Sequence, residues 1–179
     1  MDALTIFGLQ LVLSVAVYAL VAKWYVAPWL AEKPIHSALI ALIFPHAFRH
    51  LGLAFLVPGL VAQPLPGSFA FAAAYGDFVS GLLALLSLVA LRGRWSLALP
   101  LVWLFNIVGT ADLLNALRHA EAVPHLQTTW YIPTFVVPLL LVTHAMIFAR
   151  LFCHARKRPD SLVESPAFAD SPVTLANSD

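Results

Sequence analysis

The chain has 179 residues, of which 61% are hydrophobic and 11% are charged, and its formal net charge is +1. A soluble domain carries about 25% charged and about 45–50% apolar residues, so the composition excludes a water-exposed fold, whose surface needs more polar side chains. The small net charge provides no basic field for phosphates, which argues against nucleic acid as a partner. We therefore expect an all-α, polytopic integral membrane protein with the lipid bilayer as its solvent.

Five apolar stretches are long enough to cross about 30 Å of hydrocarbon, which takes about 20 helical residues each. Backbone groups in lipid must find partners within their own segment, so the sequence predicts a bundle of five transmembrane helices. The first stretch lacks a basic n-region and a cleavage site, and we expect it to remain as a span. The predicted spans cover about residues 4–27, 36–61, 69–91, 96–117 and 130–152.

The distribution of Lys and Arg predicts the orientation of these spans. The second connection has no basic residue and the fourth has only Arg118, whereas the other connections and the tail are basic. Cytoplasmic loops are enriched in Lys and Arg, which predicts an outside N-terminus and a cytoplasmic C-terminus in a bacterial inner (plasma) membrane. We assign residues 1–153 to the transmembrane domain, and expect the polar, Ser- and Pro-rich segment 154–179 to be a disordered cytoplasmic tail. The basic positions are Lys23, Lys33, Arg92, Arg94, Arg150, Arg156, Lys157 and Arg158.

Polar and ionisable side chains lie inside several predicted spans. At 1.5 Å per residue, Arg49, Asp77 and Asp112 lie about 20, 21 and 24 Å from the cytoplasmic ends of their helices. Ionisable groups inside a membrane are costly, and they usually face the bundle interior and pair there. We therefore predict that Arg49 pairs with Asp77 or Asp112. Such a pair either fixes the register of the helices or belongs to a working site.

The stretch "FPHAFRHLG" in the second span carries three of these polar residues. At 100° per residue, His46, Arg49 and His50 fall within an arc of about 100° on one helix face. Pro45 removes a backbone donor directly before this face and predicts a kink. We expect this face to form one wall of a polar cavity that binds a small molecule or a proton. The predicted cavity residues are His46, Arg49, His50, Asp77, Asn106, Asp112, Asn115 and His144.

Two alternatives remain open at this stage. His46 or His50, together with His144, is a candidate ligand set for a metal or a b-type haem, although these histidines equally suit hydrogen bonds to neighbouring carbonyls or carboxylates. The polar residues also suit a structural or assembly subunit, in which they only hold the helices together. No nucleophile, base and orienting group can be named, so the sequence assigns no catalytic residues. Among these interpretations we favour the cavity for a small ligand, a proton or a solute.

Overall fold

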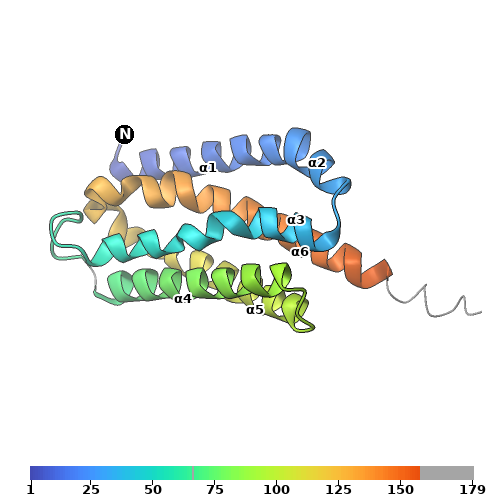
Figure 1. Ribbon diagram of the computed structural model, residues 1–179. Coiled ribbons are helices and arrows are strands. Elements are labelled where there is room, and N and C mark those ends of the chain that lie inside the picture. Colours follow the sequence, from blue (N-terminus) through green and yellow to red (C-terminus); the bar gives the residue numbers. More distant parts are fainter. Residues whose placement is uncertain (66, 158–179) are drawn as a thin grey trace, which may run out of the picture.

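A computed structural model of the chain describes residues 1–65 and 67–157, and these residues form helices and connecting turns without a β-strand. Short π-helical segments (η1 and η5) and 3₁₀ segments (η2, η3 and η4) join the α-helices, which are labelled in Figure 1. In chain order the elements are α1 (Ala3–Val21), η1 (Ala22–Val26), α2 (Ala27–Ala31), α3 (Ile35–Ile43), η2 (Phe44–Leu56), α4 (Gly67–Arg92), α5 (Ala98–Ala116), η3 (Ala120–His125), η4 (Gln127–Trp130), η5 (Ile132–Val136) and α6 (Val137–Lys157).

These elements combine into five helices that are long and apolar enough to cross a membrane, as the sequence predicts. Their bounds are Ala3–Ala31, Ile35–Leu56, Phe69–Arg92, Ala98–Ala116 and Gln127–Arg156. The second helix is shorter than the predicted 36–61, because Val57 turns to extended backbone and Gly59 adopts a positive φ of 85°. The helix of α6 continues through Lys157, and the rest of the predicted tail lies outside the described residues.

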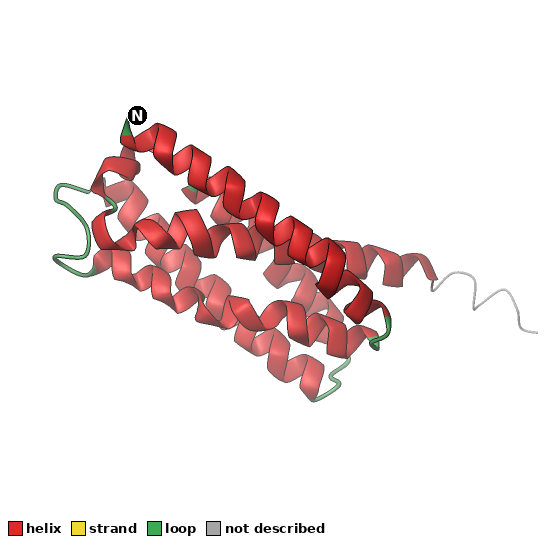
Figure 2. Cartoon of the chain, turned by 90° about the horizontal axis from the view of Figure 1, so that it is seen from above, coloured by secondary structure: helices red, strands yellow, loops and turns green. Residues whose placement is uncertain are grey.

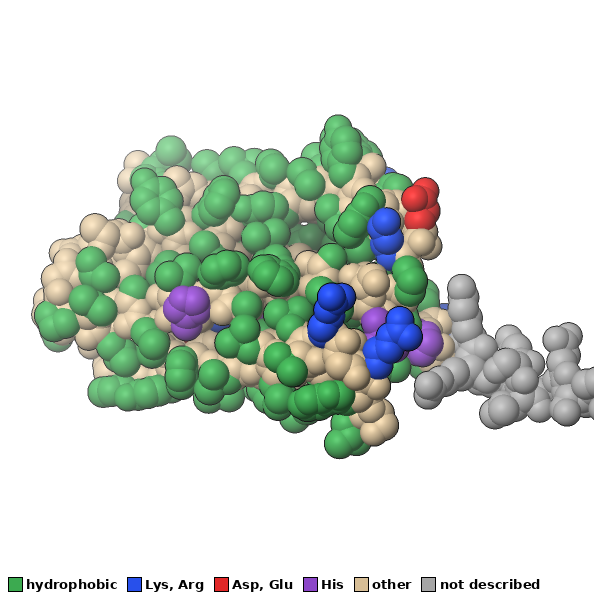
Figure 3. Space-filling model, in the orientation of Figure 1, with side chains coloured by type: hydrophobic (Ala, Val, Ile, Leu, Met, Phe, Trp, Pro, Cys, Tyr) green, Lys and Arg blue, Asp and Glu red, His purple; other side chains and the backbone are tan. Residues whose placement is uncertain are grey.

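Successive helices run in opposite directions, so the bundle has two distinct ends (Figures 1 and 2). We call the end that holds the N-terminus, residues 57–65 and residues 117–131 the N-terminal end. The other end, which we call the tail end, holds residues 32–34, residues 93–97 and the end of α6. The Lys and Arg side chains visible in Figure 3 gather toward the tail end, while hydrophobic side chains cover most of the same face. The basic connections therefore share one end of the bundle.

Helix α4 packs closely against its neighbours because its buried stripe consists mainly of small residues. Ala70, Ala73, Ala74, Ser80 and Ala84 are all buried and recur every three or four positions. Small side chains let helices approach closely, which compensates in a membrane for the missing hydrophobic drive between helices. Asp77 is the one acidic residue within this stripe, and the close packing holds it against η2 and α5.

Helix α1 contributes no buried residue to the bundle, in contrast to α4. It lies beside η5 and α6 through a few specific contacts. Trp130 Nε1 donates a hydrogen bond to Gln10 Oε1 at 2.6 Å, and the rings of Tyr18 and Phe135 lie 5.6 Å apart. The first long helix therefore contributes to the central packing mainly through Leu30 in α2, and most of that packing comes from the other four long helices.

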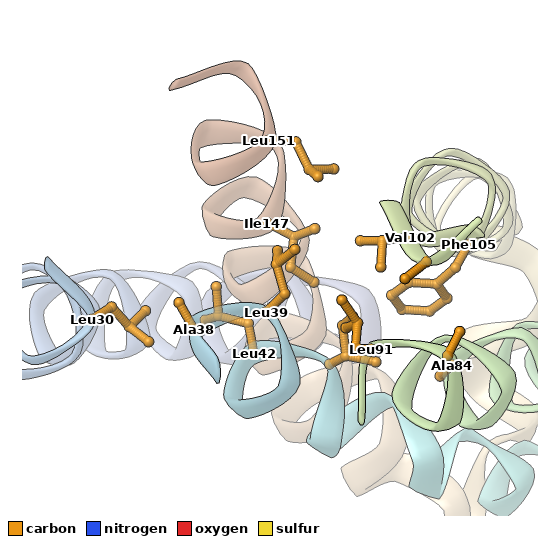
Figure 4. Close-up of a cluster of buried hydrophobic side chains, with 13 residues drawn as sticks. Leu30, Ala38, Leu39, Leu42, Ala84, Leu91, Val102, Phe105, Ile147 and Leu151 are labelled. Carbon is orange, nitrogen blue, oxygen red and sulfur yellow. The ribbon is translucent and has the colours of Figure 1, made fainter. Parts of the chain in front are cut away.

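The tail half of the bundle is filled by apolar side chains from α2, α3, α4, α5 and α6 (Figure 4). We call this set the apolar cluster. Leu39, Ile43 and Phe105 within it have no exposed surface. The full cluster is Leu30, Ala38, Leu39, Leu42, Ile43, Ala84, Ala90, Leu91, Ala98, Val102, Phe105, Ile147 and Leu151.

Candidate functional site

The polar residues of the second span are arranged by a 3₁₀ helix. Segment η2 begins just before Pro45 and runs for 13 residues, whereas 3₁₀ runs longer than three or four residues are uncommon. With three residues per turn, every third side chain lies on the same line. The buried positions follow this period, since they are His46, Arg49, Gly52 and Phe55. Arg49 therefore enters the bundle directly in line with His46.

The Arg49 guanidinium lies between two aspartates from different helices. Nε donates to Asp77 Oδ1 at 2.8 Å, and Nη2 donates to Asp112 Oδ2 at 2.5 Å. Nη1 donates to the Gly109 carbonyl at 3.0 Å. The Arg49 side chain has no exposed surface, while those of Asp77 and Asp112 are 11% and 15% exposed. The predicted ion pair of Arg49 with one aspartate is thus confirmed, and Arg49 binds both.

A second set of contacts continues from Arg49 toward the tail end. His144 Nε2 lies 3.5 Å from Arg49 Nη1, and His144 Nδ1 lies 2.6 Å from Asn106 Oδ1. An amide oxygen only accepts, so Nδ1 is assigned as the donor and Nε2 as the acceptor facing Arg49. Asn106 Nδ2 in turn donates to the His144 carbonyl at 3.2 Å. This pattern holds His144 as a neutral imidazole between α5 and α6.

His46 adds a contact between η2 and α6. Its Nε2 lies 2.9 Å from Thr143 Oγ1, whose hydroxyl donates to carbonyls of its own helix, so Nε2 is assigned as the donor. The opposite nitrogen, His46 Nδ1, and the hydroxyl of Ser80 are buried without a hydrogen-bond partner in the described part of the chain. Unpartnered buried polar atoms are rare in folded proteins, and these two leave the polar network incompletely satisfied.

The geometry does not fit a haem between the predicted ligand histidines. The ring centroids of His46 and His144 are only 4.2 Å apart, so the rings contact each other and leave no space for a macrocycle. His50 is exposed and does not join them. Among the residues that the structure describes, no group of three His, Cys, Asp or Glu side chains converges as a metal site requires. The direct contact of the two rings therefore argues against a haem held between His46 and His144.

Three glycines allow the charged groups to approach one another. A Cβ at Gly52 would overlap the Asp77 carboxylate, and a Cβ at Gly76 would overlap the Asp112 carboxylate. A Cβ at Gly109 would lie 2.8 Å from Arg49 Nη1. The side chains of the ion-pair group thus occupy space that any other residue at these positions would fill.

A pocket of about 100 Å³ leads from the two aspartates toward the N-terminal end. Asp77 and Asp112 lie at its inner end, and the segment around η3 covers its outer end. Its walls are almost entirely apolar and come from α1, η2, α4, α5 and the segment 119–137. The wall residues are Leu4, Phe7, Phe55, Phe69, Ala73, Leu113, Ala116, Leu117, Ala120, Ala122, Val123, Leu126, Ile132, Pro133 and Val137.

One polar pair borders the outer end of this pocket. His119 lines the pocket, and its Nδ1 lies 2.6 Å from Glu121 Oε1. The hydrogen bond from His119 lowers the pKa of the exposed Glu121 carboxyl below its ordinary value. His119 also contacts Phe69, with the ring centroids 5.7 Å apart. The contact between His119 and Phe69 places the covering segment beside the first turn of α4.

Six of the eight predicted cavity residues come together, and two do not. His50 and Asn115 are both exposed. His50 follows His46 by four residues, which is about 120° away in a 3₁₀ helix, and its ring contacts the Ala47 carbonyl instead. Asn115 lies about 120° around α5 from the buried Gly109. The residues that meet are His46, Arg49, Asp77, Asn106, Asp112 and His144.

Sequence reasoning missed residues that carry no charge. Thr143 partners His46, and its position directly before His144 is the signal that could have identified it. Gly52 leaves space for the Asp77 carboxylate, and Gly76 leaves space for the Asp112 carboxylate. The sequence signal for this packing is weak, because only Gly76 stands next to an acidic residue. A polar cavity was predicted, but only Asp77 and Asp112 of its predicted residues line the pocket, whose walls are ordinary apolar residues from distant segments.

The chain was compared with known proteins and families. Residues 6–152 match the family described as Domain of unknown function (DUF8737). The chain belongs to this family. No curated protein and no solved structure matches the chain. All residues of the polar network, from His46 to His144, lie within the part that matches DUF8737.

Proposed function

We propose that this protein crosses a bilayer with its five helices and binds a small ligand in the pocket that ends at Asp77 and Asp112. The observation that carries the proposal is a concave, mostly apolar pocket that is lined by two partly exposed carboxylates. Small-molecule sites are typically concave and apolar with a few convergent polar groups. Ionisable groups within a membrane also mark functional sites by default.

The pocket supports binding better than passage through the bundle. It extends from the aspartates toward the N-terminal end only. On the other side of the polar network, Phe105 lies against both histidines, with ring centroids 5.1 Å from His46 and 5.3 Å from His144. The rest of the apolar cluster fills the tail half behind Phe105. A solute that enters the pocket therefore has no polar route to the tail end in this arrangement.

A purely structural role for the polar residues fits less well. Replacing a buried ion pair by packed apolar residues is often neutral or stabilising, so holding helices together does not require these charges. The unpartnered His46 Nδ1 and Ser80 Oγ also reduce the contribution of the polar network to the stability of the helix packing. A pocket that reaches the aspartates gives the charges a further role.

A binding assay with a pocket-filling variant tests this proposal. Purified protein in detergent is screened with small apolar amines, alcohols and carboxylates of six to eight heavy atoms, using ligand-observed NMR and the thermal unfolding midpoint. Ala73 lines the pocket, so Ala73→Phe places a ring inside it, while the neighbouring exposed Ala72 provides the matched control Ala72→Phe. We expect at least one compound to bind the wild type and Ala72→Phe but not Ala73→Phe. Absence of binding to the wild type by every compound would overturn the proposal.

We also propose that the tail end faces the cytoplasm of a bacterial cell, at its inner membrane. The basic side chains at this end support that orientation. A reporter that is active only in the cytoplasm, fused after the C-terminus, is expected to be active, and an export-dependent reporter to be silent. The reverse result would reject the orientation while leaving the pocket proposal standing.

A further inference from the structure

We infer that the pocket selects small cations, namely protonated amines with a compact apolar body. This inference rests on the proposed function of the pocket and names the class of ligand that it takes. It depends on three features. The Arg49 nitrogens already donate to groups of the protein, one oxygen of each aspartate accepts no hydrogen bond, and the walls are apolar.

The arginine is not available to an anionic ligand. Its Nε binds Asp77, its Nη2 binds Asp112, and its Nη1 binds the Gly109 carbonyl and faces His144. The whole side chain is without exposed surface. An anion would have to displace a carboxylate from Arg49 to reach it. Breaking such a buried, charge-assisted contact is strongly unfavourable, so the pocket offers an anion no accessible donor from this residue.

The aspartates present acceptors to the pocket instead. Each uses one oxygen for Arg49, Oδ1 in Asp77 and Oδ2 in Asp112. Within the described residues, the second oxygen of each carboxylate accepts no hydrogen bond. Asp77 Oδ2 lies beside Gly52 and Asp112 Oδ1 beside Gly76, and both aspartates line the pocket. Two carboxylates around one guanidinium leave an excess of one negative charge, and His144 adds no positive charge when its Nε2 faces Arg49 Nη1 as an acceptor. The inner end of the pocket therefore suits a positively charged donor.

The walls determine the rest of the ligand. The aromatic rings of Phe7, Phe55 and Phe69 line the pocket together with aliphatic side chains. Aromatic faces attract cations, and apolar walls favour an apolar body behind the charged group. A cavity of about 150 Å³ holds one benzene ring, so a pocket of about 100 Å³ favours a short alkyl chain over a ring. No Lys or Arg lines the pocket among the described residues.

Three probes of matched length test the inference. Pentan-1-amine is a cation at pH 7, pentan-1-ol is neutral, and pentanoate is an anion, while their apolar bodies are nearly identical. A hydrogen bond to a charged group is stronger than one between neutral groups. We expect pentan-1-amine to bind the detergent-solubilised protein at least about tenfold more tightly than pentan-1-ol, and pentanoate to bind more weakly than either.

Two variants assign the preference to the aspartates. Asp112→Asn keeps the Asp77 partner of Arg49 and is expected to reduce the preference for the amine over the alcohol to about twofold or less. Glu32→Gln removes an exposed acid at the tail end and is expected to leave the preference unchanged. If Asp112→Asn does not fold, two measurements still test the inference. They are the order of the affinities of the three probes for the wild type, and the loss of probe binding in Ala73→Phe.

The failures of the two proposals are distinguishable. Equal or tighter binding of pentan-1-ol or pentanoate in the same pocket, blocked by Ala73→Phe, would overturn the cation preference and leave the binding function intact. A preference for the amine that survives in both Ala73→Phe and Asp112→Asn would show binding elsewhere, and would also overturn the inference. If the wild type binds none of the three probes and no compound of the wider screen, both proposals fail.

Discussion

The two halves of the bundle are built in different ways. The tail half is filled by the apolar cluster, in which Leu39 and Ile43 are completely buried. The half toward the N-terminal end contains one arginine, two aspartates and a pocket that reaches them. A bundle that needed only to be stable would use the first kind of packing throughout, because buried charges are costly in a membrane. The difference fits our proposal that the charged half binds a ligand while the apolar half supports it.

The largest effect is expected for Arg49→Ala in the charged half. The substitution leaves two carboxylates without their cation, and breaking a buried ion pair in this way costs about 3–5 kcal/mol. The unfolding free energy in detergent is the measurement. The triple variant Arg49→Ala, Asp77→Asn, Asp112→Asn removes the uncompensated charges as well, and should recover part of the loss. A triple variant that is no more stable than Arg49→Ala would contradict this electrostatic explanation.

A slightly smaller loss is expected in the apolar half. Leu39 has no exposed surface, so Leu39→Ala leaves a cavity and is expected to lower the unfolding free energy by about 3 kcal/mol. Binding in the pocket of the folded variant should be unchanged, because the cluster lies behind Phe105. The matched control is Leu9→Ala on α1, where the leucine is 51% exposed and its loss should have little effect. Loss of probe binding in folded Leu39→Ala would show that the two halves are coupled.

The contact between α4 and α5 is expected to respond to Gly76→Ala. The new Cβ would overlap the Asp112 carboxylate, and overpacking of this kind typically costs about 1–3 kcal/mol. Unfolding measurements should show this loss, and the preference for an amine should weaken because Asp112 is displaced. Gly8→Ala is the control, since a Cβ at Gly8 meets nothing within 4 Å. Equal stability of the two variants would argue against close packing at Gly76.

A loss of about 1 kcal/mol is expected for Thr143→Val, which removes the partner of His46 Nε2 while keeping the shape of the side chain. Thr110→Val provides the comparison, because the Thr110 hydroxyl donates only to Asn106 O of its own helix. Denaturation curves of the two variants should therefore differ. If both lose the same stability, the hydrogen bond between η2 and α6 contributes nothing measurable.

The smallest effect concerns the outer end of the pocket. In His119→Ala, the pKa of the Glu121 carboxyl should rise toward its ordinary value, because the hydrogen bond that lowers it is gone. In the wild type the corresponding stabilisation is present above the ordinary pKa of a glutamate and is lost as the pH falls through the lowered one. A carboxyl-detected NMR titration of both proteins measures the shift. An unchanged Glu121 titration would place His119 and Glu121 apart in solution.

The five long helices and the pairing of Arg49 could be predicted because both depend on simple geometry along the chain. The length of each helix follows from the length of its apolar stretch. Arg49 pairs with Asp77 and Asp112, which the sequence places at a similar depth along their helices. The placement of His50 could not be predicted, because the expected face assumed 100° per residue and η2 turns by about 120°. The residues that form the walls of the pocket could not be predicted for another reason. Residues from α1 and the segment 119–126 form part of its wall, and nothing in their apolar side chains indicates which distant segments they meet.

The 3₁₀ winding of η2 also changes how far the second helix reaches. A 3₁₀ helix rises about 2.0 Å per residue and an α-helix about 1.5 Å. The 22 residues of Ile35–Leu56 include nine in α3 and 13 in η2, so this helix extends about 39 Å rather than the about 33 Å of a uniform α-helix. In the membrane-spanning role proposed above, the same residues would cross a hydrocarbon layer thicker by about 6 Å. A thin helix placed in the centre of the bundle gains length without additional residues, and its neighbours can lie closer to its axis.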